Sequence, residues 1–468
     1  MSTLERRGVM KSRRTSSDFT AVKRMSPLLL GGMEKVLETV LKKITPGEKE
    51  QLEVEGIARE VEVEVGEFLP SGVRTMLTGS VVKGTFLAGE GDVDLFALFP
   101  HSYSKELMFE EVKGAVESAY PKAKMEIAYA EHPYVKFYLK GKKIDVVPAY
   151  LMVEGERIKS AVDRSQLHTK YVMEEMGKAQ RGDVRLLKRF LKANGLYGAE
   201  IKTLGFSGYL CELLVIARKD FEGVLKAASR WRGKVVLDLE KCYTNDKEIL
   251  KRFPEQFIVV DPVDSERNVA APVSAENFAR FIEVCGRFLS APSEEFFFPK
   301  KISGANIGKW LKGRNFYGIE FSNEKIVDDV LWGQIRRVSS ALGVFLEQNG
   351  FTVLGLHSFS DGKKTVLFFE LKEEELPSEK EMRGPLLKMK EDCGKFRAKH
   401  KGAKFVEKEG RIFAVEKRKW RDFSGAFKEY AKKGFVPSHL GGLRKGKVLE
   451  GRGLIRYKDG IEEYIRYR

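Results

Sequence analysis

The sequence predicts a multidomain α+β protein, and three observations carry that prediction. The chain has 468 residues of which 43% are hydrophobic, enough apolar material for about three domains. Short β-branched runs alternate with one helical pattern between residues 73 and 150. Helical periodicity dominates from about 160 to 290, and residues 296–468 mix strands with helices.

The N-terminal 32 residues are rich in Arg and Ser and contain no long apolar stretch. We expect a disordered tail there, because so few apolar side chains cannot join a core. Met33 is then a candidate for the natural start, since an amphipathic helical pattern begins with it and continues to residue 43. A second, charged helix is expected at about 46–66.

The elements that follow are expected to form a small mixed α/β domain. Strand-like runs lie at 76–77, 93–99, 125–128, 134–139 and 144–147, with one helix near 104–119. Further along, 3.6-residue periodicity predicts helices at 183–194, which stops at Gly195, and at 275–289, which ends before Pro292. In the last third we expect strands at 365–371 and 412–415 and helices at about 328–348 and 380–399.

A turn of small residues precedes the strand expected at 93–99. Gly79 and Ser80, with Gly84 completing the pattern Gly-Ser-x-x-x-Gly, supply backbone N–H groups and a hydroxyl that can approach phosphate oxygens closely. Gly-Ser turns are common, so this turn predicts a phosphate site only in combination with acidic residues downstream of it.

Three carboxylates supply that combination. Asp92 and Asp94 lie two residues apart at the start of the strand, so both side chains point to one face. Asp145 enters another β-branched run that could pair alongside. Carboxylates brought together repel one another unless a divalent cation lies between them, and three are what two-Mg²⁺ phosphoryl transfer needs. An Asp-x-Asp at a strand edge is otherwise usually solvated.

Positive charge is concentrated at the C-terminal end. The formal net charge is +16; residues 381–468 hold 25 Lys and Arg against 12 Asp and Glu, whereas residues 1–24 hold 7 against 2. Aromatic residues are interspersed among the C-terminal charges. This composition is typical of a surface that binds a phosphate backbone, and its alternative is a basic surface that only confers solubility.

Cysteine usage and hydropathy exclude several classes of protein. The four cysteines form no C-x-x-C pair, and no histidine lies at zinc-ligand spacing. The most apolar run, residues 209–217, contains Glu212 and is far too short to span a membrane. We therefore expect a soluble protein of the reducing cytoplasm, with no membrane partner.

Several blocks are more specific than these patterns: YAEHPY (129–134), DVVPAY (145–150), IKSAVDR (158–164), VRLLK (184–188), KANGLYG (192–198), FSGYLCELL (206–214) and VVDPVDSERNVAA (259–271). Together they resemble the archaeal class I CCA-adding enzymes, the tRNA nucleotidyltransferases. The resemblance implies a polymerase-β-like catalytic head (33–160), a helical neck like that of poly(A) polymerase and oligoadenylate synthetase (161–292), and an α/β RNA-binding body (293–468) with an inserted tail at about 325–385.

The resemblance also implies an activity. Such enzymes rebuild the 3′-terminal CCA of the tRNA acceptor end from CTP and ATP without a nucleic-acid template, and they usually act as homodimers. A poly(A) polymerase or oligoadenylate synthetase type of enzyme is the alternative within the superfamily. A non-catalytic RNA-binding protein is the alternative outside it.

Roles carry over from the family position by position. Asp92, Asp94 and Asp145 become metal ligands, and the nucleotide contacts are Gly79, Ser80, Lys83, His132, His168, Lys188, Tyr197 and Arg267, the last of which would read the incoming base. Two departures stand out, because the family usually has Glu at the position of Asp92 and Arg at that of Lys83.

The residues alone leave other readings open. Lys188 could lie on a solvated helix face, Tyr197 could be core, and His168 could be structural. Arg267, near Asp261 and Asp264, could form a surface ion pair. His132 could merely shape a turn with Pro133.

Overall fold

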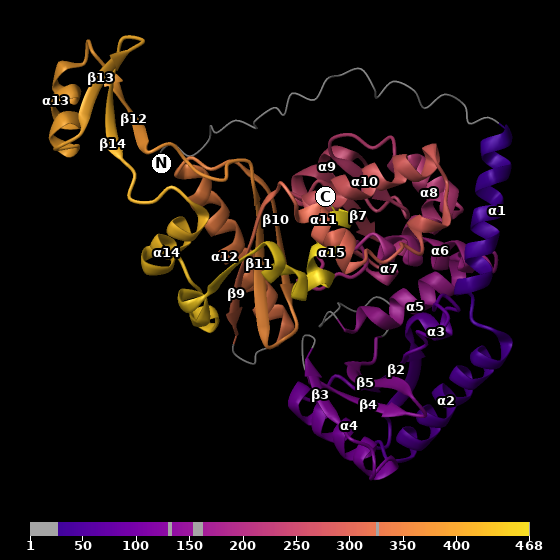
Figure 1. The fold of residues 1–468 in the computed structure, drawn as a ribbon. Helices are drawn as coiled ribbons and strands as arrows, with labels where there is room; N and C mark the ends of the chain where they lie inside the picture. Colours follow the sequence, from indigo (N-terminus) through magenta and orange to yellow (C-terminus); the bar gives the residue numbers. More distant parts are fainter. Residues whose placement is uncertain (1–26, 130–132, 153–161, 324–326, 468) are drawn as a thin grey trace. The chain divides into compact units, whose positions relative to one another are not determined.

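The computed structural model describes residues 27–129, 133–152, 162–323 and 327–467, which fall into two compact units (Figure 1). Unit 1 comprises Met1–Arg189, Glu212–Trp231 and Ile282–Phe298, and unit 2 comprises Phe190–Cys211, Arg232–Phe281 and Pro299–Arg468. Helices α6 (Gln180–Ala193), α7 (Gly208–Arg218) and α10 (Ala275–Ser290) each contribute residues to both units. None of the described helices is long and apolar enough to cross a bilayer.

Unit 1 is built on a five-stranded mixed sheet of order β1-β2-β5-β4-β3. Its central strands β2 and β5 are parallel and its other pairs antiparallel. The strands and the crossover helix match the sequence prediction: β1 (Arg74–Thr78), β2 (Val93–Phe99), α4 (Lys105–Ala119), β3 (Glu126–Tyr129), β4 (Pro133–Leu139) and β5 (Lys142–Tyr150).

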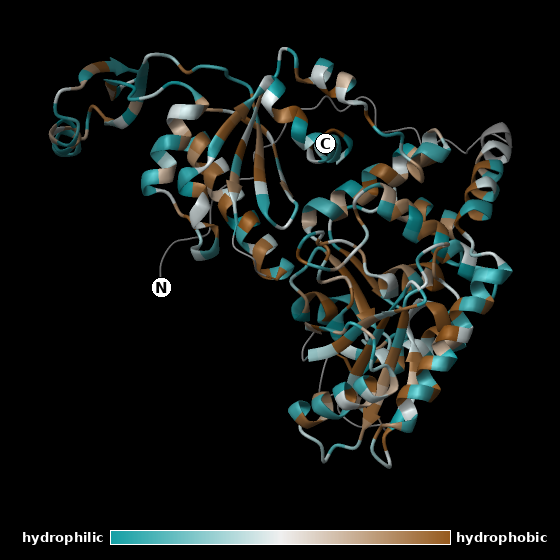
Figure 2. Cartoon of the chain, turned by 60° about the horizontal axis from the view of Figure 1, so that its bottom comes forward, coloured by the Kyte–Doolittle hydropathy of each residue, from teal (hydrophilic) through white to brown (hydrophobic). Residues whose placement is uncertain are grey.

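One face of this sheet packs against two helices. Helices α2 (Glu48–Glu67) and α4 bury Val54, Val61 and Val112 against Leu95 and Phe137 in one core cluster. Figure 2 shows the result as hydrophobic strands behind helices that alternate between hydrophobic and hydrophilic residues. Because this face is occupied, functional side chains of the central strands must use the other face.

The remaining helices of unit 1 include one difference from the sequence prediction. Helix α1 (Pro27–Ile44) begins six residues before Met33, so residues 27–32 are helical and do not belong to an unstructured tail, whereas residues 1–26 lie outside the described chain. Proline is accepted at the first position of a helix, and three leucines follow it. The other elements are α3 (Gly79–Val82), α5 (Arg164–Glu175), α8 (Phe221–Ala228) and η1 (Glu294–Phe296), with the parts of α6, α7 and α10 noted above.

Unit 2 contains a small sheet that the sequence analysis missed by expecting only helices between 160 and 290. Strands β6 (Val235–Asp238), β7 (Phe257–Asp261) and β8 (Asp264–Asn268) form a sheet of order β6-β7-β8, with α9 (Asp246–Arg252) between the first two. β7 is buried along its whole length. Short, continuously apolar runs of this kind carry no periodicity that separates a buried strand from a helix.

A four-stranded antiparallel sheet of order β10-β11-β9-β15 is the second sheet of unit 2. Helices α12 and α14 and the turns of η2 pack on one of its faces, where Phe369 and Phe423 are fully buried. Its elements are α11 (Gly304–Leu311), β9 (Asn315–Ser322), α12 (Asp328–Gln348), β10 (Val353–Ser360), β11 (Lys364–Leu371), α14 (Phe423–Lys433), η2 (Ser438–Lys445), β15 (Lys447–Glu450), η3 (Gly451–Tyr457) and α15 (Lys458–Tyr467).

A three-stranded sheet of order β12-β14-β13 completes unit 2, with β12 (Glu379–Leu386), α13 (Lys390–Lys399), β13 (Lys404–Lys408) and β14 (Arg411–Lys417). The predicted helix at 380–399 is therefore wrong in its first half. Pro385 disfavours helical backbone at Gly384, and the preceding residues pair with β14 instead.

Candidate active site

Two of the predicted carboxylates lie side by side on the face of the unit 1 sheet opposite α2 and α4, beside a small core cluster that includes Phe96 and Val147. Asp94 on β2 is the direct register partner of Asp145 on the parallel strand β5. Asp92 precedes β2 by one residue and belongs to the same alternation. The parallel pairing of β2 and β5 thus brings together acidic residues that are 51 positions apart in the sequence.

A lysine that the sequence analysis did not assign joins this acidic cluster. Lys143 Nζ lies 3.0 Å from Asp92 Oδ2 and 3.3 Å from Asp145 Oδ2. The signal for it was present, because Lys143 precedes Asp145 by two positions on one strand and therefore points to the same face. The ammonium group partly neutralises the carboxylates.

The electrostatics of the cluster reflect crowding of negative charge. Burial, followed by the charges of Asp145 and Asp92, raises the pKa of Asp94 to about 6, against an opposing effect of Lys143. Burial also raises the pKa of Asp145, although Lys143 lowers it in part. Burial lowers the pKa of Lys143, but its hydrogen bond to Asp92 and the charge of Asp145 outweigh this and raise it overall. A site that disfavours its own negative charge is ready to accept a further cation.

The residues present fit a divalent metal. Asp145 Oδ1 is buried and has no hydrogen-bond partner within the described chain, and hard carboxylate oxygens are the ligands that Mg²⁺ prefers. Over residues 27–129, 133–152, 162–323 and 327–467, no three His, Cys, Asp or Glu side chains are grouped tightly enough to hold a metal ion as they stand. Lys143 instead bridges two of the three carboxylates.

The Gly-Ser turn lies directly against the acidic cluster. Gly79 begins α3 with a φ of +77°, and a Cβ atom there would lie 2.9 Å from Asp94 Cγ and overlap Asp94 Oδ2. Glycine is therefore required at this position on two grounds, backbone conformation and close approach. Ser80 follows in the same short helix, and its carbonyl oxygen accepts a 2.8 Å hydrogen bond from the N–H of Thr85.

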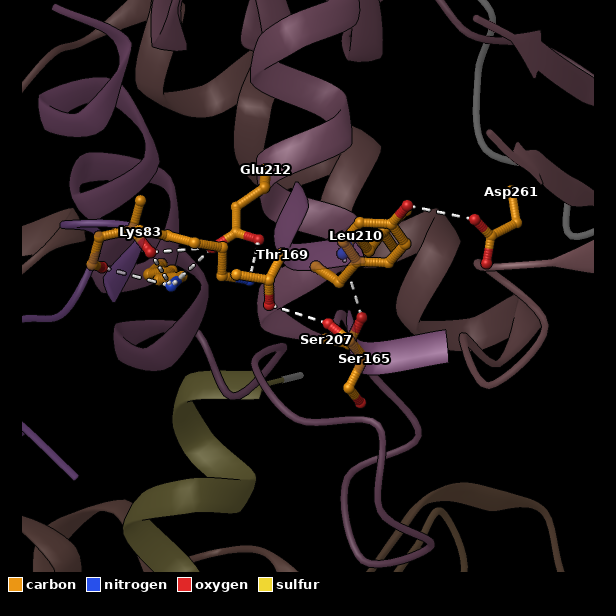
Figure 3. A network of polar contacts seen from close by, with 10 residues as sticks. Lys83, Ser165, Thr169, Ser207, Leu210, Glu212 and Asp261 are labelled. Atoms are coloured by element: carbon orange, nitrogen blue, oxygen red, sulfur yellow. Dashed lines mark hydrogen bonds and ion pairs between the residues drawn. The ribbon is translucent and has the colours of Figure 1, made fainter. Parts of the chain in front are cut away.

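The two predicted phosphate-binding lysines of unit 1 lie in a buried polar network (Figure 3). Lys83 Nζ pairs with Glu212 Oε2 at 2.5 Å, and Lys188 Nζ lies 3.6 Å from Glu212 Oε1. The lysine side chains are only 9% and 4% exposed. The solvated helix face that remained open for Lys188 is thereby excluded.

Two of the predicted nucleotide contacts are histidines. His168 lies half-buried on α5 of unit 1. His132 lies outside the described residues.

The last two predicted nucleotide contacts belong to unit 2. Tyr197 forms an isolated bridge to Phe206, and the Lys192 ammonium lies 5.0 Å from the centre of its ring. Arg267 on β8 pairs with Asp261 at 2.7 Å, and Asp261 is completely buried and also accepts a hydrogen bond from Tyr209 (Figure 3). The ion pair that the sequence leaves open as the alternative for Arg267 is therefore present, and its carboxylate partner is buried.

Comparisons with known proteins match this architecture in order along the chain. A nucleotidyltransferase domain model matches residues 58–168, the second domain of tRNA nucleotidyltransferase matches 182–298, and the C-terminal domain of CCA-adding enzyme matches 312–438. The CCA-adding enzyme of Archaeoglobus fulgidus is 38% identical over 85% of this chain and 90% of its own length. The chain belongs to the CCA-adding enzymes.

Another curated relative agrees with this membership. The CCA-adding enzyme of Methanocaldococcus jannaschii is 34% identical over 89% of this chain and 96% of its own length. Among solved structures, the chain is similar to the Cid1 poly(U) polymerase with a TM-score of 0.44 and 13% identity, covering 55% of this chain and 94% of that one. Membership of the CCA-adding enzymes, together with the match to the nucleotidyltransferase domain model, makes the protein an enzyme with a nucleotidyltransferase domain.

Proposed function

We propose that this CCA-adding enzyme adds and repairs the 3′-terminal CCA of tRNA at the acidic cluster of unit 1, using CTP and ATP. The observation that carries the proposal is the pairing of Asp94 with Asp145 beside the Gly-Ser turn, in a chain that belongs to this family. The 3′-hydroxyl of tRNA attacks the α-phosphate in line, the new phosphodiester bond forms, and pyrophosphate leaves. No covalent intermediate with the protein is needed.

The residues of the acidic cluster have different roles in this reaction. Asp92, Asp94 and Asp145 would hold Mg²⁺, which supplies activation of the attacking hydroxyl and neutralisation of phosphate charge when bound. Asp94 must be ionised for this role, and because its pKa is raised to about 6 in the metal-free protein, a proton competes with the metal at low pH. Lys143 contributes fixed positive charge where negative charge gathers.

We assign contacts with the nucleotide to Gly79, Ser80, Lys83 and His132, contacts with its triphosphate and sugar to His168, Lys188 and Tyr197, and contacts with its base to Arg267. Support for this assignment comes from the family resemblance and, in unit 1, from the position of the Gly-Ser turn against Asp94. We also propose that the basic C-terminal quarter of the chain binds tRNA and that the protein acts as a cytoplasmic homodimer.

The test uses tRNA that lacks CCA, with Mg²⁺ and with CTP and ATP singly and together, followed by sequencing of the 3′ ends. The wild type should add two C with CTP alone and CCA with both nucleotides. Asp94→Asn and Asp145→Asn should each abolish addition, whereas Glu117→Gln, on the exposed side of α4, should leave it unchanged. Homopolymer addition, or turnover by either Asn variant, would overturn the proposal.

A further inference from the structure

Glu212 is a completely buried carboxylate that no step of the proposed chemistry uses. It lies on α7, and its two oxygens have different partners: Oε2 pairs with Lys83 at 2.5 Å, and Oε1 accepts a 2.8 Å hydrogen bond from the Thr85 hydroxyl. An ionised side chain at this depth is costly unless it is paired and hydrogen-bonded. The arrangement around Glu212 meets that requirement.

Lys188 completes the network from helix α6. Its ammonium donates hydrogen bonds to the carbonyl oxygen and the hydroxyl oxygen of Thr85, at 3.2 and 3.1 Å, and lies 3.6 Å from Glu212 Oε1. Burial opposes the ionisation of Glu212, but the two lysines outweigh it and hold its pKa below the ordinary value. Two ammonium groups facing one carboxylate leave a surplus positive charge in a buried position, which suits a polyanionic ligand.

Glu212 and its partners hold the C-terminal end of the Gly-Ser turn region, and the other end of this region lies against Asp94. Gly79 contacts Asp94 at one end, and Thr85 is held by Glu212 and Lys188 at the other. Just beyond, Arg185 on α6 donates hydrogen bonds to the carbonyl oxygens of Gly84 and Phe86, at 2.8 and 2.9 Å. Residues 83–86, which follow the Gly-Ser turn, are therefore held by side chains of α6 and α7, and Glu212 of α7 contacts both Lys83 of this segment and Lys188 of α6 (Figure 3).

We propose that Glu212 is a positioning residue for nucleotide binding: its carboxylate holds Lys83, Thr85 and Lys188 so that the Gly-Ser turn is preformed for a nucleoside triphosphate. The inference rests on the proposed function and deepens it. Glu212 touches neither base nor ribose in this role, so CTP and ATP depend on it equally. It is also separate from the three carboxylates that hold the metal.

The test is Glu212→Gln, which preserves the volume and one acceptor for Thr85 but removes the charge. KM for both CTP and ATP should rise about 10- to 100-fold, the effect of losing a charge-assisted hydrogen bond, with kcat within about threefold of wild type. Mn²⁺ affinity should not change. Glu117→Gln is the matched control, because it removes the same charge from an exposed pair on α4 and should leave both KM values unchanged.

A double-mutant cycle tests whether Glu212 acts through its lysine partner. Lys83→Met combined with Glu212→Gln should raise KM no further than the more severe of the two single substitutions. If Glu212→Gln does not fold, Thr85→Val, which removes only the bridging hydroxyl, should raise KM for both nucleotides in the same direction.

Two outcomes overturn the inference. One is an unchanged KM in folded Glu212→Gln, or in Thr85→Val where that variant must replace it. The other is a fall in kcat with KM preserved. The KM and kcat of the variants are interpreted only if the wild-type protein adds CCA to tRNA. If the wild type does not add CCA, the proposed function fails, and this result is distinct from a failure of the inference about Glu212.

Discussion

Comparing Gly79→Ala with Gly89→Ala should separate the cost of backbone strain from the effect of displacing Asp94 in the acidic cluster. Gly89 has a φ of +78°, nearly the same as the +77° of Gly79, yet a Cβ on Gly89 meets nothing within 4 Å. A Cβ on Gly79 overlaps Asp94 Oδ2 and lies 2.9 Å from Asp94 Cγ. Both substitutions therefore strain the backbone, but only Gly79→Ala displaces a carboxylate.

The magnitudes can be worked out from these two effects. Forcing a side chain into left-handed backbone costs about 1 kcal/mol, which lowers the melting temperature by roughly 2–4 °C in a unit of this size. Gly79→Ala carries that cost and also moves the Asp94 carboxylate by on the order of 1 Å, a misplacement that can reduce turnover about 100-fold.

Thermal melting and single-turnover addition of C to tRNA lacking CCA measure the two effects. Gly89→Ala should melt slightly earlier with wild-type turnover, and Gly79→Ala should melt at least as early with turnover reduced about 100-fold or more. Near-wild-type turnover by Gly79→Ala would refute the reasoning, because it would mean that Asp94 need not stay where the structure places it.

Three further predictions concern charge. Because the pKa of Asp94 is raised to about 6, the metal-free folded protein binds a proton at Asp94 at a higher pH than the unfolded chain does. The melting temperature of the wild type, relative to that of Asp94→Asn, should therefore fall as pH rises from 4 to 7. A difference in melting temperature that does not change with pH would contradict the raised pKa. Lys143→Met removes a cation that competes with a metal, so Mn²⁺ affinity by calorimetry should increase about 5- to 10-fold while the metal-free protein melts earlier; weaker Mn²⁺ binding would show that Lys143 supports the site. The substitutions Lys390→Gln, Lys399→Gln and Lys401→Gln neutralise three exposed lysines of unit 2. The slope of log K for tRNA binding against the logarithm of salt concentration should then become shallower by up to about 0.7–0.9 for each phosphate that is no longer neutralised. An unchanged slope would mean that tRNA binds elsewhere on the protein.

The acidic cluster could be predicted from sequence because its information is local. The apolar runs at 93–99 and 144–147 predict strands. Because successive side chains of a strand point to opposite faces, Asp92 and Asp94 are then expected on one face, and Asp145 can join them from the neighbouring strand. Lys143 obeys the same rule and was still missed, because a lysine beside acidic residues is usually solvated. Only the register of β5 shows that its ammonium reaches Asp92.

The Glu212 network could not be predicted in the same way. Lys83 and Glu212 are 129 residues apart in the sequence, and the buried partner of Lys188 is likewise on another helix, so no local pattern indicates either contact. Strands β6 to β8 were not predicted for a related reason, because a fully buried strand such as β7 shows no alternation of apolar and polar residues in its sequence. The error at 380–389 is of another kind, because Pro385 was a visible signal against a helix.

The parallel pairing of β2 with β5 also has a consequence for how the enzyme is made. Asp94 and Asp145 meet only when a loop that contains α4, β3 and β4 is closed, a non-local closure that is intrinsically slow. Domains fold largely as units during synthesis, N-terminal parts first. On the ribosome, a nascent chain that has not yet exposed β5 holds its first two acidic residues without their partner, so catalytic competence arises late in the emergence of this sheet.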